Sequence, residues 1–326
     1  MPTRRDVLIA SASAAALAGT SAKTAHHEDG NMPDLSGKSV LITGASSGFG
    51  YLGAQHYARA GATVVASMRN LPRPEADALL RIVADGNLDI HIVEIDVLDD
   101  ASVMEGVAEA ERLVGGTLDV VINNAGIGMG GPVEISDMEA AQLMFGTNVL
   151  GAQRVSRAAL PKMRAKGGGV IVNISSQLGR VMFPNLGLYS ATKFALEAMS
   201  EQMAYELAPR GVELTIIQPG GYPTEIWEKG NRHTQEMLAR ADDERKTAYA
   251  ELVENAFPEG TAETDPMDVP RAIAGIVAMP AGQRPLRLAV HPGPKPQLAI
   301  NHVSAKTQSA LLGGSPYAAW AKDVLS

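Results

Sequence analysis

From residue 38 onward, short runs rich in Val and Ile alternate with longer segments whose apolar residues recur at helical period. The short runs lie at residues 39–43, 62–67, 89–95, 118–123, 169–175, 212–218 and 286–290. Helical periodicity is clearest over residues 102–114 and 195–207. Runs that are apolar on both sides are typical of parallel strands covered by helices on two faces. The pattern predicts an α/β fold, with a single doubly wound parallel sheet of about seven strands and helices on both faces.

Two segments interrupt this alternation. Residues 221–260 form a long insertion after the sixth strand, which we interpret either as a lid over a substrate or as a solvated amphipathic helix. Residues 292–326 form a C-terminal extension that begins in a cluster of prolines and glycine. The extension docks either on its own domain or on a partner subunit. We therefore expect one domain over residues 36–291, including the insertion, followed by the extension.

Residues 1–30 differ in composition from the rest. Arg4 and Arg5 precede an apolar stretch from Val7 to Gly19, which is shorter than the ~20 residues that a membrane-spanning helix needs. This order of regions resembles a twin-arginine export signal. We expect a leader of this type, export to the periplasm and no stable membrane span; the alternative is a disordered basic tail on a cytoplasmic protein.

Composition excludes several functions. The chain of 326 residues is 45% hydrophobic and 20% charged, as in a folded globular protein. It has no cysteine, so thiolate nucleophiles and cysteine-ligated metals are absent. With 28 basic against 36 acidic residues the net charge is -8, which disfavours nucleic acid as a partner. The seven histidines are scattered without metal-ligand spacing, so no metal site is expected.

A glycine-rich turn, TGASSGFG at residues 43–50, follows the first strand and opens a helix. Gly44 permits a tight turn, Gly48 lets backbone N–H groups approach a pyrophosphate, and Gly50 permits close helix packing. The helix N-terminus adds partial positive charge. A second glycine cluster, GIGMGG at residues 126–131, is interpreted as a flexible turn after the fourth strand.

Further motifs follow in a fixed order. They are Asp96-Val97 after the third strand, NNAG at residues 123–126, Asn148, Ser176, Tyr189-x-x-x-Lys193, and Pro219-Gly220 with Thr224. Together with the glycine-rich turn, this series resembles the short-chain dehydrogenase/reductase family over residues 38–224. The resemblance implies a Rossmann-like sheet and an NAD(P)H-dependent oxidoreductase that interconverts a secondary alcohol and a ketone or aldehyde.

Tyr189 and Lys193 are four residues apart on a predicted helix, so they share one face. A phenol ionises near pH ~10, and lowering that pKa to about 7 requires about 4 kcal/mol. A cation at ~4 Å supplies energy of this order at an effective dielectric of ~20. The residues therefore predict that Lys193 lowers the pKa of Tyr189, helped by the positive ring of an oxidised nicotinamide.

The resemblance implies four catalytic residues. Tyr189 would exchange a proton with the substrate oxygen, and Lys193 would also hold the nicotinamide ribose. Ser176 would hydrogen-bond the substrate carbonyl, and Asn148 would hold a water that links Lys193 to solvent. The implied cofactor-binding residues are Gly44, Ser46, Ser47, Gly48, Phe49, Gly50, Arg69, Asp96, Val97, Asn123, Ala125, Gly126, Tyr189, Lys193, Pro219, Gly220, Tyr222 and Thr224.

The end of the second strand bears on the choice of coenzyme. An acidic residue there would accept hydrogen bonds from a free ribose 2′-hydroxyl, whereas an arginine favours a 2′-phosphate. Met68 occupies that position and Arg69 follows it, so NADP(H) is favoured over NAD(H). Ser47 argues in the other direction, because many NADP-using relatives carry a basic residue there.

The candidate pocket residues are mostly apolar, and no arginine among them is placed to clamp a carboxylate. They are Met129, Gln177, Leu178, Phe183, Leu186, Tyr222, Ile226 and Trp227. We expect a small-molecule carbonyl or alcohol substrate with an apolar body. The alternatives are a non-catalytic cofactor-binding protein and an isomerase or dehydratase that recycles its cofactor. By analogy, the helices over residues 152–166 and 190–209 predict a homo-oligomer, a dimer or tetramer.

Overall fold

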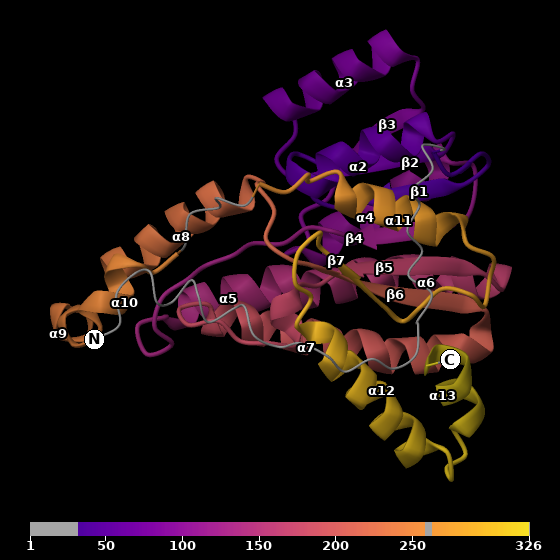
Figure 1. Ribbon diagram of the computed structural model, residues 1–326. Coiled ribbons are helices and arrows are strands. Elements are labelled where there is room, and N and C mark those ends of the chain that lie inside the picture. The colour runs from indigo at the N-terminus through magenta and orange to yellow at the C-terminus, as the bar shows by residue number, and fades with distance from the viewer. Residues whose placement is uncertain (1–31, 258–262, 326) are drawn as a thin grey trace. The chain divides into compact units, whose positions relative to one another are not determined.

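The computed structural model describes residues 32–257 and 263–325 of the chain. Seven parallel strands form one sheet in the order β3-β2-β1-β4-β5-β6-β7 (Figure 1). The strands are β1 (Ser39–Ile42), β2 (Thr63–Met68), β3 (Ile90–Glu94), β4 (Val120–Asn123), β5 (Gly169–Ile174), β6 (Val212–Pro219) and β7 (Arg287–Val290). Every strand lies within two residues of its predicted bounds, so the predicted fold class is confirmed.

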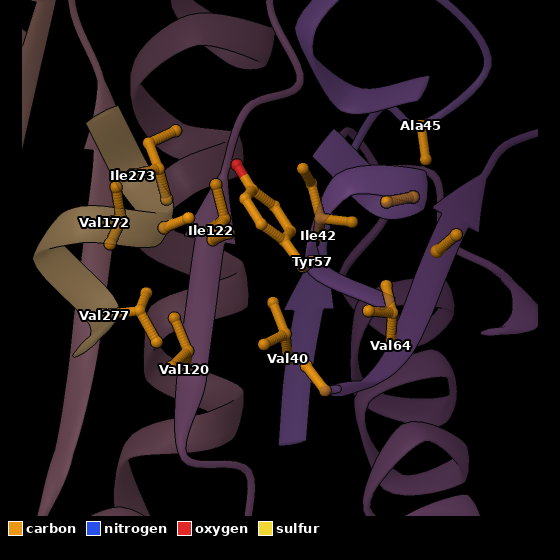
Figure 2. Close-up of a cluster of buried hydrophobic side chains, with 14 of the residues drawn as sticks. Val40, Ile42, Ala45, Tyr57, Val64, Val120, Ile122, Val172, Ile273 and Val277 are labelled. Carbon is orange, nitrogen blue, oxygen red and sulfur yellow. The ribbon is translucent and has the colours of Figure 1, made fainter. Parts of the chain in front are cut away.

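Helices cover both faces of the sheet. One face packs against α2 (Gly48–Arg59), α3 (Pro74–Gly86) and α11 (Asp268–Ala278), and Figure 2 shows Tyr57, Ile273 and Val277 against the strands. The other face packs against α4 (Asp100–Leu113), α6 (Ala152–Lys166) and α7 (Gly187–Leu207).

Alternation along each strand divides the apolar side chains between the two faces. In β1, Val40 and Ile42 belong to one buried cluster and Leu41 to the other. This is why the strands read as continuous apolar runs in the sequence.

The strand order places the ligand site. The sheet grows outward from β1 toward β2 and from β4 toward β5, so the chain turns in opposite directions after these two neighbouring strands. Open α/β sheets bind ligands in the crevice that such a switch point leaves beyond the carboxyl ends of the strands. The glycine-rich turn follows β1, and the NNAG segment follows β4.

Over its described residues, 221–257, the 221–260 insertion contains three helices, α8 (Ile226–Arg240), α9 (Asp243–Ala248) and α10 (Ala250–Glu254). The apolar side of α8 packs through Met237 and Leu238 onto α5 (Met138–Phe145) and its neighbours. The chain then passes from α5 into α6 through a π-helix at Gly146–Gly151.

The C-terminal extension contains α12 (Gln297–Leu312) and α13 (Ala318–Leu325). Val324 and Leu325 pack against the core cluster beneath α7. These contacts place the end of α13 on the chain's own domain, and docking of the extension on a partner subunit stays a prediction.

The leader predicted over residues 1–30 lies outside the described residues. Within residues 32–257 and 263–325, no helix combines the length and apolarity needed to cross a membrane.

Candidate active site

A cavity of about 960 Å³ opens at the carboxyl ends of the strands. The loops that follow β1, β2, β3, β4, β5 and β6 all contribute to its wall. Sixteen of the eighteen predicted cofactor-binding residues line it; Gly50 and Asn123 do not.

The glycine-rich turn has the geometry of an anion cradle. Gly44 and Gly48 have φ angles of 68° and 53°, in the left-handed region that favours glycine. A Cβ on Gly50 would lie 2.4 Å from the Gly44 carbonyl oxygen, so Gly50 packs within the turn, as its predicted packing role requires, and does not reach the cavity. The first turn of α2 has no acidic residue, and no side chain caps it. Its first N–H groups therefore remain available for a phosphate.

The two asparagines after β4 have different roles. The Asn123 side chain donates to Ser156 Oγ at 3.0 Å and Asn173 Oδ1 at 2.8 Å inside the core, so its assignment to the cofactor-binding set is wrong. Asn124 lines the cavity and donates to the Thr43 and Gly44 carbonyls at 2.8 and 3.2 Å. Asn124 thereby holds the glycine-rich turn. Side-chain alternation at the end of the strand could have separated the two.

Ser176, Tyr189 and Lys193 all line the cavity. Ser176 ends the loop after β5, and its Oγ accepts a hydrogen bond from Leu178 N at 3.1 Å, which leaves its own proton free to donate. Tyr189 and Lys193 share one side of α7, and Lys193 Nζ lies 5.6 Å from the Tyr189 ring centroid. Lys193 is 5% exposed and donates to the Ile174 carbonyl at 2.9 Å.

Burial shifts the pKa of both residues of this pair in the chain alone. Burial raises the pKa of Tyr189 to about 12, and contact with the Ser176 hydroxyl only partly opposes this rise. Burial also lowers the pKa of Lys193 to about 8, although the nearby Glu197 carboxylate acts in the other direction. In the chain alone, removal from water is the largest cause of both shifts. The lowering of the pKa of Tyr189 by Lys193 together with an oxidised nicotinamide stays a prediction.

Asn148 lies in the π-helix, behind the cavity wall. Its Oδ1 accepts from Ile127 N at 2.8 Å, and its Nδ2 donates to Ile127 O at 2.9 Å and Thr192 Oγ1 at 3.0 Å. The side chain thus fixes the turn after β4 beside Lys193, since a Cβ on Gly126 would lie 3.4 Å from Asn148 Oδ1 and 3.7 Å from Lys193 Nζ. The water-holding role stays a prediction.

The part of the cavity near the end of β2 is rich in charge. Arg69 follows that strand, and Arg73 is paired with Glu75 at 2.8 Å. From α8, Lys229 reaches Ser47 Oγ at 2.9 Å. Around the whole cavity, five basic residues (Arg69, Arg73, Lys193, Lys229 and Arg232) face two acidic ones (Glu75 and Asp96). The cavity is thus positive in a protein whose net charge is -8.

The part near Tyr189 is mainly apolar. Seven of the eight predicted pocket residues line the cavity, namely Gln177, Leu178, Phe183, Leu186, Tyr222, Ile226 and Trp227. Met129 does not, because it is buried with Met144 and Met237 in a separate apolar cluster. Its placement in the pocket is wrong.

The GIGMGG segment does more than turn the chain. The Phe257 ring packs against Gly128 and against Gly230 of α8. A Cβ added to Gly128 would lie 3.2 Å from this ring, and a Cβ added to Gly230 would lie 2.5 Å from it. The glycines therefore let Phe257 and α8 pack closely over the turn after β4. Sequence reasoning missed a group of cavity residues that periodicity alone does not mark: Asn124, Thr147, Lys229, Arg232, His233 and Phe257.

Comparison with known proteins identifies the family of this chain. The sequence model of the short chain dehydrogenase family matches residues 38–235. An uncharacterized oxidoreductase, YusZ, of Bacillus subtilis is 36% identical over 71% of this chain and 81% of its own length. Human retinol dehydrogenase 8 is 34% identical over 74% of this chain and 78% of its own.

A solved short-chain dehydrogenase from Streptomyces avermitilis is 32% identical, with a TM-score of 0.67 over 84% of this chain and 94% of its own. Among similar solved structures, some contain NAD or NADH and others NADP. This chain belongs to the short-chain dehydrogenase/reductase family and has the family's oxidoreductase fold.

Proposed function

We propose that this protein is an NADP(H)-preferring oxidoreductase that interconverts a secondary alcohol and a ketone or aldehyde on an apolar substrate. One observation carries the proposal: Ser176, Tyr189 and Lys193 face a single cavity that also contains the glycine-rich turn. A nicotinamide coenzyme bound along that turn would supply or accept the hydride.

The residues of the chain supply proton transfer and orientation. Ser176 Oγ accepts from Leu178 N and its hydroxyl contacts that of Tyr189, so its proton would be available to a substrate oxygen bound between the two hydroxyls. Tyr189 is protonated near neutral pH, as its pKa of about 12 requires, and it gives its proton to the carbonyl oxygen during reduction. Lys193, held by the Ile174 carbonyl, places a positive charge beside the phenol and stabilises the phenolate that remains.

Charge at the end of β2 supports NADP(H). Arg69 is exposed there and lines the cavity, so its guanidinium is free to pair with a 2′-phosphate. Glu75 would repel that phosphate, but Arg73 holds it by two hydrogen bonds at 2.8 and 2.9 Å and neutralises it.

The cavity wall supports an apolar substrate. Leu178, Leu186, Ile226, Trp227 and Phe257 surround the space on the side of Tyr189. At the rim, Phe183 is 58% exposed and its neighbour Met182 is 65% exposed, so the apolar lining continues to the surface. A hydrophobic ketone would bury these side chains on binding.

The test is a panel of ketones, aldehydes and secondary alcohols assayed with NADPH and NADH side by side. We expect apolar ketones to be reduced with NADPH, and Tyr189→Phe to lose at least 100-fold in kcat, the scale of general-acid catalysis. Tyr317→Phe, which removes a hydroxyl from an exposed tyrosine of the extension, is the matched control and should be unchanged. Reduction confined to anionic substrates would contradict the apolar assignment.

The same panel separates the alternatives. A recycling isomerase or dehydratase would form product without net consumption of NADPH. A non-catalytic binding protein would hold the coenzyme and turn over nothing.

We also propose export by the twin-arginine leader, with a cytoplasmic enzyme as the alternative, and assembly into a dimer or tetramer. N-terminal sequencing of protein recovered from cell fractions tests the leader. Light scattering of the purified protein gives its oligomeric state.

A further inference from the structure

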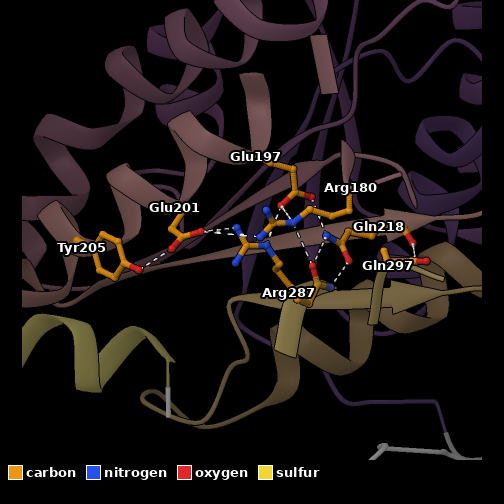
Figure 3. A network of polar contacts seen from close by, with 8 residues as sticks. Arg180, Glu197, Glu201, Tyr205, Gln218, Arg287 and Gln297 are labelled. Carbon is orange, nitrogen blue, oxygen red and sulfur yellow. Dashed lines mark hydrogen bonds and ion pairs between the residues drawn. The ribbon is translucent and has the colours of Figure 1, made fainter. Parts of the chain in front are cut away.

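A buried polar network joins side chains of α7, β6 and β7 (Figure 3). Glu197, one helical turn after Lys193 on α7, is 1% exposed. Its Oε2 accepts from Arg287 of β7 at 2.7 Å and lies 3.6 Å from Arg180 Nε. Its Oε1 accepts from Gln218 of β6 at 2.8 Å. Charges this deeply buried need partners, so the position of each side chain in the network depends on the positions of the others.

Arg180 connects this network to the loop that carries Ser176. It follows a short 3₁₀ helix at Gln177–Gly179, which Ser176 caps. That turn lies directly on α7: a Cβ on Gly179 would be 2.9 Å from Glu197 Cγ and 3.2 Å from the Lys193 carbonyl oxygen. The Ser176 turn is therefore in close contact with the turn of α7 that holds Lys193. A displacement of Arg180 would shift the Ser176 turn relative to Lys193.

The C-terminal extension completes the network. Asn301 of α12 accepts from Arg180 Nε at 3.1 Å through Oδ1. Its Nδ2 donates to Gln218 Oε1 at 2.7 Å, and the Nε2 of that same Gln218 side chain donates to Glu197. Asn301 thus holds two of the three side chains that contact Glu197, Arg180 and Gln218, although α12 as a whole buries only Gln297.

We propose that Asn301 is a positioning residue for catalysis, through which the C-terminal extension sets the separation of Ser176 from Tyr189 and Lys193. The inference rests on the proposed function. Without Asn301, Gln218 loses a donor and Arg180 loses its hydrogen-bond acceptor on α12, which leaves Arg180 only the longer contacts with the Glu197 and Glu201 carboxylates at 3.6 and 4.0 Å. The Arg180 side chain then moves toward water and takes the Ser176 turn with it.

The experiment compares Asn301→Ala with Thr307→Ala, which removes an exposed side chain from the same helix. Turnover is expressed per coenzyme-binding site, counted by fluorescence titration, so a loss of folded protein does not count as a loss of kcat. We expect Asn301→Ala to lower kcat about tenfold, within the range that misplacement of reacting groups causes. The KM for the coenzyme should change less than twofold, and Thr307→Ala should match the wild type.

Hydrogen exchange of the apo proteins supplies a readout without substrate. The peptide that spans the Ser176 turn and Arg180 should exchange faster in Asn301→Ala and not in Thr307→Ala. In an Arg180→Ala background, Asn301→Ala should have little further effect on kcat, because the two residues act through one contact.

The outcomes are distinct. Equal kcat for the wild type and Asn301→Ala, faster exchange without a change in kcat, or additive losses in the double variant would each overturn the inference. A wild type that reduces no carbonyl compound with either coenzyme would instead overturn the proposed function.

Discussion

Lys193, a predicted catalytic residue, carries a charge that is buried, and burying this charge lowers the stability of the folded chain. Burial lowers its pKa from 10.5 to about 8, so between these values the unfolded chain binds the proton more tightly than the folded one. One pKa unit corresponds to about 1.4 kcal/mol, and the full shift to about 3 kcal/mol. Because the folded pKa is the lower one, the cost is complete below pH 8 and disappears as the pH rises toward 10.5.

Lys193→Met removes the charge and keeps a side chain of similar length. The free energy of unfolding of the wild type, relative to this variant, should therefore rise by roughly 2 kcal/mol between pH 7 and pH 10. At neutral pH the net gain of the variant is smaller than 3 kcal/mol, because the Ile174 carbonyl loses its donor, a loss of about 1–3 kcal/mol. The dependence on pH, and not the absolute stability, is the quantity to measure.

The assay is urea unfolding of the apo proteins between pH 6 and 10, followed by circular dichroism. The difference between the two proteins at each pH cancels the other titrating groups, including the tyrosines whose raised pKa values act above pH 10. Lys38→Met, at an exposed lysine before β1, is the control for the loss of a lysine away from the cavity. A flat difference for Lys193→Met would refute the reasoning.

Three other substitutions test the site and the core. Arg69→Ala should weaken NADPH binding about tenfold and NADH binding less than twofold, since a charge-assisted hydrogen bond at a partly hydrated site contributes about 1–2 kcal/mol. Fluorescence titration with both coenzymes measures the two affinities, and equal losses would exclude Arg69 as the partner of the 2′-phosphate. Gly44→Ala should abolish measurable coenzyme binding, because φ is 68° and the new Cβ would lie 2.9 Å from Ala125 Cα; near-normal binding would contradict the cradle. Arg287→Met should lower the free energy of unfolding by about 3–5 kcal/mol, because it removes the cation that pairs with the buried Glu197 carboxylate at 2.7 Å. Urea unfolding measures this change, and a loss under 1 kcal/mol would show that water reaches Glu197.

Much of the fold was predictable because its signals are local. A strand of a doubly covered parallel sheet is a run of Val and Ile, and β5 and β6 could be placed from such runs alone. The glycine-rich turn, Ser176 and the Tyr189–Lys193 spacing also follow from short sequence patterns. These elements account for the sheet, the switch point and the catalytic face of α7.

The rest depends on contacts between residues far apart in the chain. Phe257 packs on Gly128, and Asn301 bonds to Arg180 and Gln218, across separations of 121 and 83 residues in the latter two cases. Periodicity cannot reveal such partners, because it reports which side of an element is buried and not what lies against it. Asn123 and Asn124 are a different case, because adjacent side chains at a strand end point to opposite sides and this alternation could have separated them.

The direction of the pKa shift at Tyr189 also depends on residues far apart in the chain, because these residues enclose the phenol. Sequence reasoning supplied the attraction between a phenolate and an ammonium four residues away, but it could not supply the enclosure that removes both groups from water. In the structure that enclosure dominates: Tyr189 holds its proton more tightly and Lys193 less tightly than in water. A phenol in this state is ready to protonate a carbonyl oxygen. Ionising it for alcohol oxidation requires additional positive charge in the cavity, which an oxidised nicotinamide ring would bring.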